Sequence, residues 1–268
     1  MTPTQVHQQY DVPYISQVVR VNPSLDAIEF EWVVGPIPVG DQVGKEIITR
    51  YVTDLNSGHT FTTDANGRQM MTRVVNHRPS WKLQVHEPVS GNYYPVNSRI
   101  ALKDESRGLQ LTVLTDRSQG GTSLANGTLE LMVHRRLLND DYFGVSEPLN
   151  EPGTDGAGLV IRGKHLVQLS TIKDAASKHR PLGQELFLPP LLSFGQYAQE
   201  YTTKYQTTLT GLTSDLPPNV HLLTLERWTA GQLLLRLEHY YQKGEHSTLS
   251  LPVTFNLRNL FTHFEITG

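Results

Sequence analysis

The stretch LQLTVLTDRSQGGTSLANGTLELMVHRR (109–136) contains two runs of strand-forming residues. In the first run, 109–116, apolar side chains fall on both faces of the expected strand, which is typical of a strand buried between two layers. The second run, 128–136, follows an Asn126-Gly127 pair. Asn-Gly readily takes the positive φ angles of a tight hairpin, so the stretch predicts antiparallel strands with a buried member.

Similar short runs recur along the chain, bounded by Gly, Pro, Asn or Asp, and very little of the sequence has a helical period. The clearest further strands are expected at 27–34, 46–52, 97–104, 183–194, 221–228, 232–241 and 247–257. A second Asn-Gly hairpin turn is expected at 64–68. The sequence therefore predicts an all-β fold, a large antiparallel β-sandwich.

At most one short helix is expected, at 170–180. Ser170 or Thr171 would cap its first turn, and Pro181 would stop it.

The Gly- and Pro-rich segment NEPGTDGAG (150–158) indicates either a boundary or a long surface loop. A chain of 268 residues can form one large β domain or two smaller ones. We expect a first β-sandwich part over 1–152, which carries the segment HRRLLNDD, and a second β part over 153–268 that completes the sandwich.

Composition excludes several classes of protein. Lys and Arg together number 23 against 26 Asp and Glu, and the basic residues are scattered, so nucleic acid is not an expected partner. The chain has no cysteine, which rules out disulfides, thiolate catalysis and Cys-based zinc sites. No run of 18 apolar residues and no signal-like N-terminal stretch occurs, so neither a membrane span nor an export signal is expected within this sequence.

The segment HRRLLNDD places Arg135, Arg136, Asp140 and Asp141 close together after a β-type run. Hydrolysis of a glycoside needs two carboxyl groups on opposite sides of the scissile bond, and adjacent aspartates are not placed to straddle it. Judged locally, the segment is a charged turn on a solvated surface. No HxxxH, HxH or HxD pattern occurs, so no metal site is expected in this chain.

Asn126-Gly127-Thr128 is the only Asn-x-Ser/Thr sequon. Two interpretations stand: Asn126 is glycosylated in a secreted chain, or Asn-Gly serves only the hairpin turn.

Several stretches closely resemble one family, and they occur in the same order along the chain. They are EWVVGPIPVGDQVGKEIITRY (31–51), TDANGRQM (63–70), EPVSGNYYPVNSRI (87–100), LQLTVLTDRSQGGTSLANGTLELMVHRRLLNDD (109–141) and GVSEPLNE (144–151), with weaker matches at 215–228, 233–239 and 252–261. They resemble the C-terminal β region of lysosomal-type α-mannosidases, the class II, zinc-dependent, retaining enzymes. The resemblance implies a galactose mutarotase-like super-sandwich.

The resemblance also implies how the chemistry is divided. In the family, the nucleophile, the acid/base carboxylate and the zinc ligands belong to an upstream domain, so no catalytic residue and no metal ligand is expected in this chain. The implied cofactor, zinc, would be bound by that companion domain. Arg135 and Arg136 match the family's paired arginines, one of which lies at the sugar-binding site. Asp140 and Asp141 match the paired acids that follow, and they are expected mainly to orient the arginines. A guanidinium suits this role because its fixed fork of donors can hold sugar hydroxyls.

One departure from the family concerns Tyr142 and Phe143, where relatives commonly have a small or charged residue and Arg. The two aromatic side chains could stack on a sugar face or contact the adjoining domain.

The sequence thus supports two hypotheses. In the first, the chain is the C-terminal β portion of an acid α-mannosidase that removes terminal α-linked mannose from glycans; it would be inactive alone and reside in the lysosome or outside the cell. Its expected partners are the catalytic domain or chain of the same enzyme and mannose-containing glycans, in a homo-oligomer. In the second, the chain is a stand-alone, non-catalytic glycan-binding or structural module.

Overall fold

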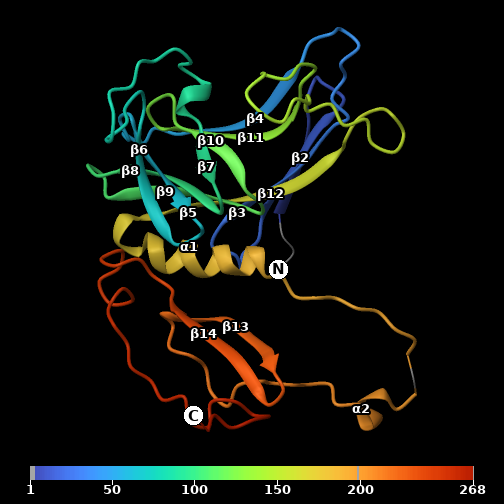
Figure 1. The fold of residues 1–268 in the computed structure, drawn as a ribbon, viewed down its shortest axis with the longest axis vertical. Helices are drawn as coiled ribbons and strands as arrows, with labels where there is room; N and C mark the ends of the chain where they lie inside the picture. The colour runs from blue at the N-terminus through green and yellow to red at the C-terminus, as the bar shows by residue number, and fades with distance from the viewer. Residues whose placement is uncertain (1–3, 198, 268) are drawn as a thin grey trace. The chain divides into compact units, whose positions relative to one another are not determined.

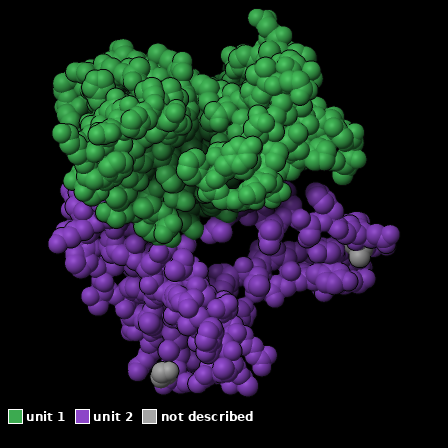
Figure 2. Space-filling view, turned by 45° about the horizontal axis from the view of Figure 1, so that its top comes forward, with its two compact units in different colours: residues 1–187 green, residues 188–268 purple. Residues whose placement is uncertain are grey.

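The computed structural model describes residues 4–197 and 199–267, which form two compact units, 1–187 and 188–268 (Figures 1 and 2). The first unit contains β1 (Thr4–Gln9), β2 (Ile15–Val21), β3 (Ile28–Val34), β4 (Lys45–Val52), β5 (Thr60–Ala65), β6 (Gln69–Val74), η1 (Ser90–Asn92), β7 (Tyr94–Val96), β8 (Arg99–Asp104), β9 (Leu109–Thr115), β10 (Gln119–Thr122), β11 (Thr128–Arg136), β12 (Ile161–Thr171) and α1 (Ile172–Phe187). The second contains α2 (Tyr201–Lys204), β13 (Val220–Thr229) and β14 (Gln232–His239).

Two antiparallel sheets build the first unit. An eight-stranded sheet has the order β1-β2-β3-β12-β9-β8-β5-β6, and a four-stranded sheet has the order β4-β11-β10-β7. The all-β sandwich expected from the sequence is confirmed, as are the strands expected at 27–34, 46–52, 97–104, 109–116 and 128–136. Both Asn-Gly turns join antiparallel strands, β5 to β6 and β10 to β11.

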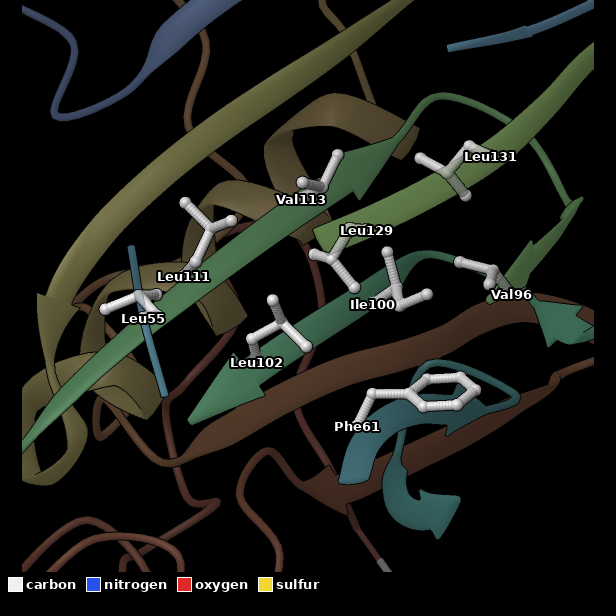
Figure 3. Packing of buried hydrophobic residues seen from close by; sticks show 9 residues of the cluster. All are labelled: Leu55, Phe61, Val96, Ile100, Leu102, Leu111, Val113, Leu129 and Leu131. Carbon is white, nitrogen blue, oxygen red and sulfur yellow. The ribbon is translucent and has the colours of Figure 1, made fainter. Parts of the chain in front are cut away.

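The core lies between the two sheets. Phe61, Ile100 and Val113 from the eight-stranded sheet meet Leu129 and Leu131 of β11, and each side chain is at most 1% exposed (Figure 3). These residues alternate along their strands, so each strand turns one face inward. The sandwich is therefore held by a continuous apolar layer.

Strand β9 is covered on both sides, as its two apolar faces predict. Leu111 and Val113 belong to the core between the sheets. Leu114 lies on the opposite face and approaches Gly183 of α1. Helix α1 thus covers the outer face of the large sheet along β9 and β12 (Figure 1).

Helix α1 begins after Thr171, as predicted, but it does not end at Pro181. The Thr171 hydroxyl accepts the Asp174 amide N–H at 3.3 Å and so caps the first turn, and it donates to the Asp174 carboxylate at 2.6 Å. Pro181 lies inside the helix, so the expected stop is wrong. A helix-interior proline costs about 3 kcal/mol. Packing of Gly183 against Leu114 and the hydrogen bonds from the buried Arg180 guanidinium to the Gly67 and Arg68 carbonyls oppose that cost.

The domain division differs from the expected one at 152/153, since the two units meet at 187/188. The segment 150–158 is part of the connection between β11 and β12. Because β12 pairs with β3 and β9, it belongs to the first unit.

In the second unit, strands expected at 221–228 and 232–241 form the hairpin β13–β14. Those expected at 183–194 and 247–257 are wrong: residues 183–187 are helical, and neither 188–194 nor 247–257 forms a strand. Pro189, Pro190 and Pro252 lack the N–H that a ladder needs.

Neither α1 nor any other described helix is long and apolar enough to cross a membrane.

Candidate functional site

Strand β11 carries the two arginines to the end of the four-stranded sheet. It pairs with β4 over its whole length, with a shift of register between Met132 and His134. Such a bulge bends a strand and re-aims the side chains that follow it. Arg135 and Arg136 are the last two residues of β11 and point to opposite faces.

The Arg136 guanidinium is used within the first unit. Its Nε donates to Asn150 Oδ1 at 2.6 Å, and its Nη1 donates to the carbonyls of Ile37 and Ala157 at 2.9 and 2.7 Å. A Cβ on Gly158 would lie 2.5 Å from Nη1, so only glycine leaves room for this contact. Arg136 therefore ties three backbone segments together.

Arg135, by contrast, is half exposed and weakly paired. Its side chain is 48% exposed, and the one ion pair that it forms with a described residue joins Nη1 to Glu46 Oε1 at 3.4 Å. An exposed pair at that distance contributes little, so the guanidinium donors are available to another group.

Two neighbouring hollows meet at Arg135. A hollow of about 410 Å³ lies under the loop that follows β11, and one of about 730 Å³ lies on the outer face of the four-stranded sheet. Arg135, Leu149 and Glu151 line both. The larger volume is that of a site for a small ligand.

Asp140 and Asp141 line the smaller hollow, and their expected role of orienting the arginines stays a prediction. Their carboxylates accept the backbone N–H groups of Tyr142 and Phe143 at 3.1 and 3.0 Å. Among the described residues, neither aspartate forms a hydrogen bond or ion pair with Arg135. Two consecutive Asx turns thus shape the loop tip.

The same turns present an apolar tip to solvent. Tyr142 is 90% exposed and Phe143 is 94% exposed. Tyr142 also has a positive φ of 63°, an uncommon conformation for a bulky side chain.

A polar network that the sequence analysis missed lies at the larger hollow, which Glu130 and Tyr93 line. Buried Glu130 of β11 accepts hydrogen bonds from Arg50 Nε at 2.9 Å and from the Tyr93 hydroxyl. Burial, and then the bond to Glu130, raise the pKa of Tyr93 well above its usual range. The only signal was a carboxylate at an outward position of the apolar run TLELMV.

His134 also lines the larger hollow, and its Nε2 lies 3.2 Å from the Leu159 carbonyl. Burial lowers the pKa of His134, the hydrogen bond to Leu159 opposes this shift, and the Arg136 guanidinium adds to it.

Among the described residues, no group of three or more His, Asp or Glu side chains is placed to share a metal ion. The resemblance assigns the implied zinc to a companion domain, and its binding there stays a prediction.

The sequon lies on the hairpin between β10 and β11. Asn126 is exposed, and its Oδ1 accepts the Gly58 N–H at 2.8 Å. Gly127 has a φ of +68°, and a Cβ there would lie 2.5 Å from the Thr53 carbonyl. The turn therefore requires Asn-Gly for its own geometry, while glycosylation of Asn126 stays a prediction.

Two family models match this chain. The "Glycosyl hydrolases family 38 C-terminal domain" covers residues 2–143, and the "Glycosyl hydrolases family 38 C-terminal beta sandwich domain" covers residues 219–267. The chain belongs to glycosyl hydrolase family 38. The first match ends just after the segment HRRLLNDD.

Curated members of family 38 match nearly the whole chain. Lysosomal alpha-mannosidase of Homo sapiens is 53% identical over 268 residues, which are 98% of this chain and 26% of that protein. Alpha-mannosidase At3g26720 of Arabidopsis thaliana is 41% identical over the same shares. The resemblance to the C-terminal β region of lysosomal-type α-mannosidases is confirmed, and the chain spans about a quarter of the length of these relatives.

Solved structures of the family share the fold. An alpha-mannosidase from Enterococcus faecalis V583 superposes with a TM-score of 0.57 at 13% identity, over 83% of this chain and 23% of that one. A family 38 protein from Enterococcus faecalis gives a TM-score of 0.55 at 12% identity, over 85% and 26%.

Proposed function

We propose that this chain is the C-terminal β portion of an acid α-mannosidase that hydrolyses terminal, non-reducing α-D-mannose residues of glycans. It scaffolds the catalytic domain and lends one wall of the sugar pocket. The observation that carries this role is the half-exposed Arg135 guanidinium at the junction of two hollows, in a chain 53% identical to a lysosomal alpha-mannosidase.

The proposal separates positioning from chemistry. Zinc and the catalytic carboxylates would be supplied by a companion domain of the same enzyme, as the family resemblance implies. The enzyme would act in the lysosome or outside the cell, as a homo-oligomer. The chain alone is expected to be inactive.

Arg135 is the better candidate of the two arginines. Arg136 already satisfies three acceptors, and withdrawing it would leave the Asn150 side chain and two carbonyls without their donor. Arg135 gives up only a 3.4 Å contact to Glu46. A sugar hydroxyl or a carboxylate of the companion domain can therefore take its donors at little cost.

The test compares the two arginines in the full-length enzyme, with cleavage of a chromogenic α-mannoside at acid pH. Arg135→Ala is expected to lower kcat/KM about 10- to 100-fold at an unchanged melting temperature, since one charge-assisted contact is lost. Arg136→Ala is the matched control: it should lower the melting temperature by several degrees, while the folded fraction keeps its kcat/KM.

Arg135→Lys keeps the positive charge but loses the planar set of guanidinium donors, so its kcat/KM is expected to lie between those of the wild type and Arg135→Ala. Wild-type kinetics for Arg135→Ala would remove the residue from the pocket.

The intact mass and zinc content of the native particle separate the proposal from a stand-alone module. A particle of this chain alone, without zinc and without α-mannosidase activity, would overturn the enzyme function.

A further inference from the structure

The small sheet of the sandwich ends early on one side. β4 pairs with β11 on one edge, and no described strand pairs with its other edge. Opposite it, the large sheet continues past β3 through β2 and β1. Four strands therefore face eight, and the inner side of β1 and β2 has no strand above it among the described residues.

A hollow of about 370 Å³ runs along the free edge of β4. Five consecutive residues of this strand, 47–51, line it. One face of a strand presents only every second residue, so a hollow lined by consecutive residues lies against the strand's edge. The hollow thus borders a row of backbone N–H and C=O groups that have no ladder partner in β11.

The floor of this hollow is apolar and aromatic. Phe30, Trp32 and Val34 of β3 line it at alternate positions, so they are the inward face of that strand. The Trp32 Nε1 is buried and has no hydrogen-bond partner among the described residues. A buried donor without an acceptor is costly, but this atom has almost no accessible surface, so it is not a group that the hollow offers to an occupant.

The inward face continues outward onto β2 and β1. Val19 of β2 pairs in register with Phe30 and with Val6 of β1, so the three share the inner side. Val6 is 55% exposed, whereas Trp32 is 3% exposed. The inward side chains of the eight-stranded sheet therefore become more exposed beyond the edge of the four-stranded sheet.

We propose that an extended segment of the same mannosidase polypeptide, from outside these 268 residues, adds as a strand to the free edge of β4 and covers the floor formed by β2 and β3. This rests on the proposed function, because the segment comes from the longer enzyme. The chain spans 26% of its human relative, so such an enzyme contains ample further chain. The segment would hydrogen-bond to β4 and place alternate apolar residues over Trp32 and Val19.

Hydrogen exchange of the full-length enzyme, resolved to single amides, tests the strand. A paired edge protects all the amides of 46–52, so the alternate amides that point away from β11 should exchange on the order of 100-fold or more slower than an unprotected peptide. Unprotected exchange at these alternate positions would overturn the proposal.

Two neighbouring valines supply a matched pair of variants. Val19 lies on the inward face of β2 and Val18 on the outward face, opposite Glu31. In Val19→Lys the added strand would trap an ammonium group, so exchange at the alternate β4 amides should rise at least about 10-fold. Val18→Lys should leave it unchanged, and equal effects of the two variants would contradict the inference.

A structure of the intact enzyme identifies the occupant. A strand from the same polypeptide supports the proposal; a strand from a second copy, a glycan or solvent along β4 overturns it. Activity on an α-mannoside in the same preparation is scored separately. An inactive enzyme with the strand in place would sink the proposed function alone.

Discussion

The two units of the chain share β-rich sequence but differ in closure. The first encloses a core between two sheets, with Ile100, Leu129 and Leu131 fully buried. Among its described residues, the second has one hairpin, whose Trp228 and Leu233 are 65% and 47% exposed. A lone hairpin is marginally stable in water. Strand-forming sequence therefore yields a stable fold only where a second layer covers it.

The largest expected difference between the units is in their thermal unfolding when each is expressed by itself. Residues 1–187 should unfold cooperatively with heat, because their apolar layer is complete. Residues 188–268 should show no cooperative transition. Circular dichroism at increasing temperature, with dispersion of amide signals in NMR spectra, measures both. A sharp transition for residues 188–268 would show that the hairpin is stable without further cover.

A matched pair of leucines sharpens the comparison. Leu129→Ala in β11 is expected to lower the free energy of unfolding by about 2–5 kcal/mol, since it opens a cavity at a fully buried site. Leu233→Ala in β14 removes the same atoms from a half-exposed position and should cost less than about 1 kcal/mol. Chemical denaturation of the full-length enzyme measures both. Similar losses would mean that cover supplied elsewhere buries Leu233.

The strands of the first unit could be predicted because their periodicity agrees with the burial they acquire. In β9 both faces are apolar, and both a sheet and a helix cover them. Prediction failed where packing overrode a local preference. Proline usually ends a helix, but α1 continues past Pro181 to Phe187. Prediction also failed over 247–257, where an apolar run has no partner strand among the described residues.

The candidate site, too, could be predicted from the sequence only in part. The motif singled out Arg135 and Arg136 together, but sequence alone could not separate a half-exposed guanidinium from one that ties Ile37 to Ala157. Those acceptors lie far along the chain and become neighbours only through the fold. The network around Glu130 was missed for the same reason, since Arg50 and Tyr93 lie on other strands.

The core of the first unit also encloses a titratable group. His165 of β12 is fully buried; its Nδ1 lies 3.0 Å from the Tyr51 hydroxyl and its Nε2 lies 2.7 Å from Gln119 Oε1. A neutral ring satisfies both contacts if Tyr51 donates to Nδ1 and Nε2–H donates to Gln119. Burial lowers the pKa of His165 from 6.5 to about 4.

The stability of the first unit should therefore depend on pH through His165. The folded pKa is below the unfolded one, so the unfolded chain binds the proton more readily between pH 6.5 and about 4. The contribution of His165 is fully present above pH 6.5 and is lost as pH falls, about 2 kcal/mol by pH 5 and about 3 kcal/mol by pH 4. His165→Gln should flatten this part of the profile, whereas His263→Gln, at an exposed position of the second unit, should leave it unchanged. Urea unfolding of residues 1–187 and of the full-length enzyme between pH 4 and 7.5 measures the slope; an equally steep profile for His165→Gln would assign the dependence to other groups.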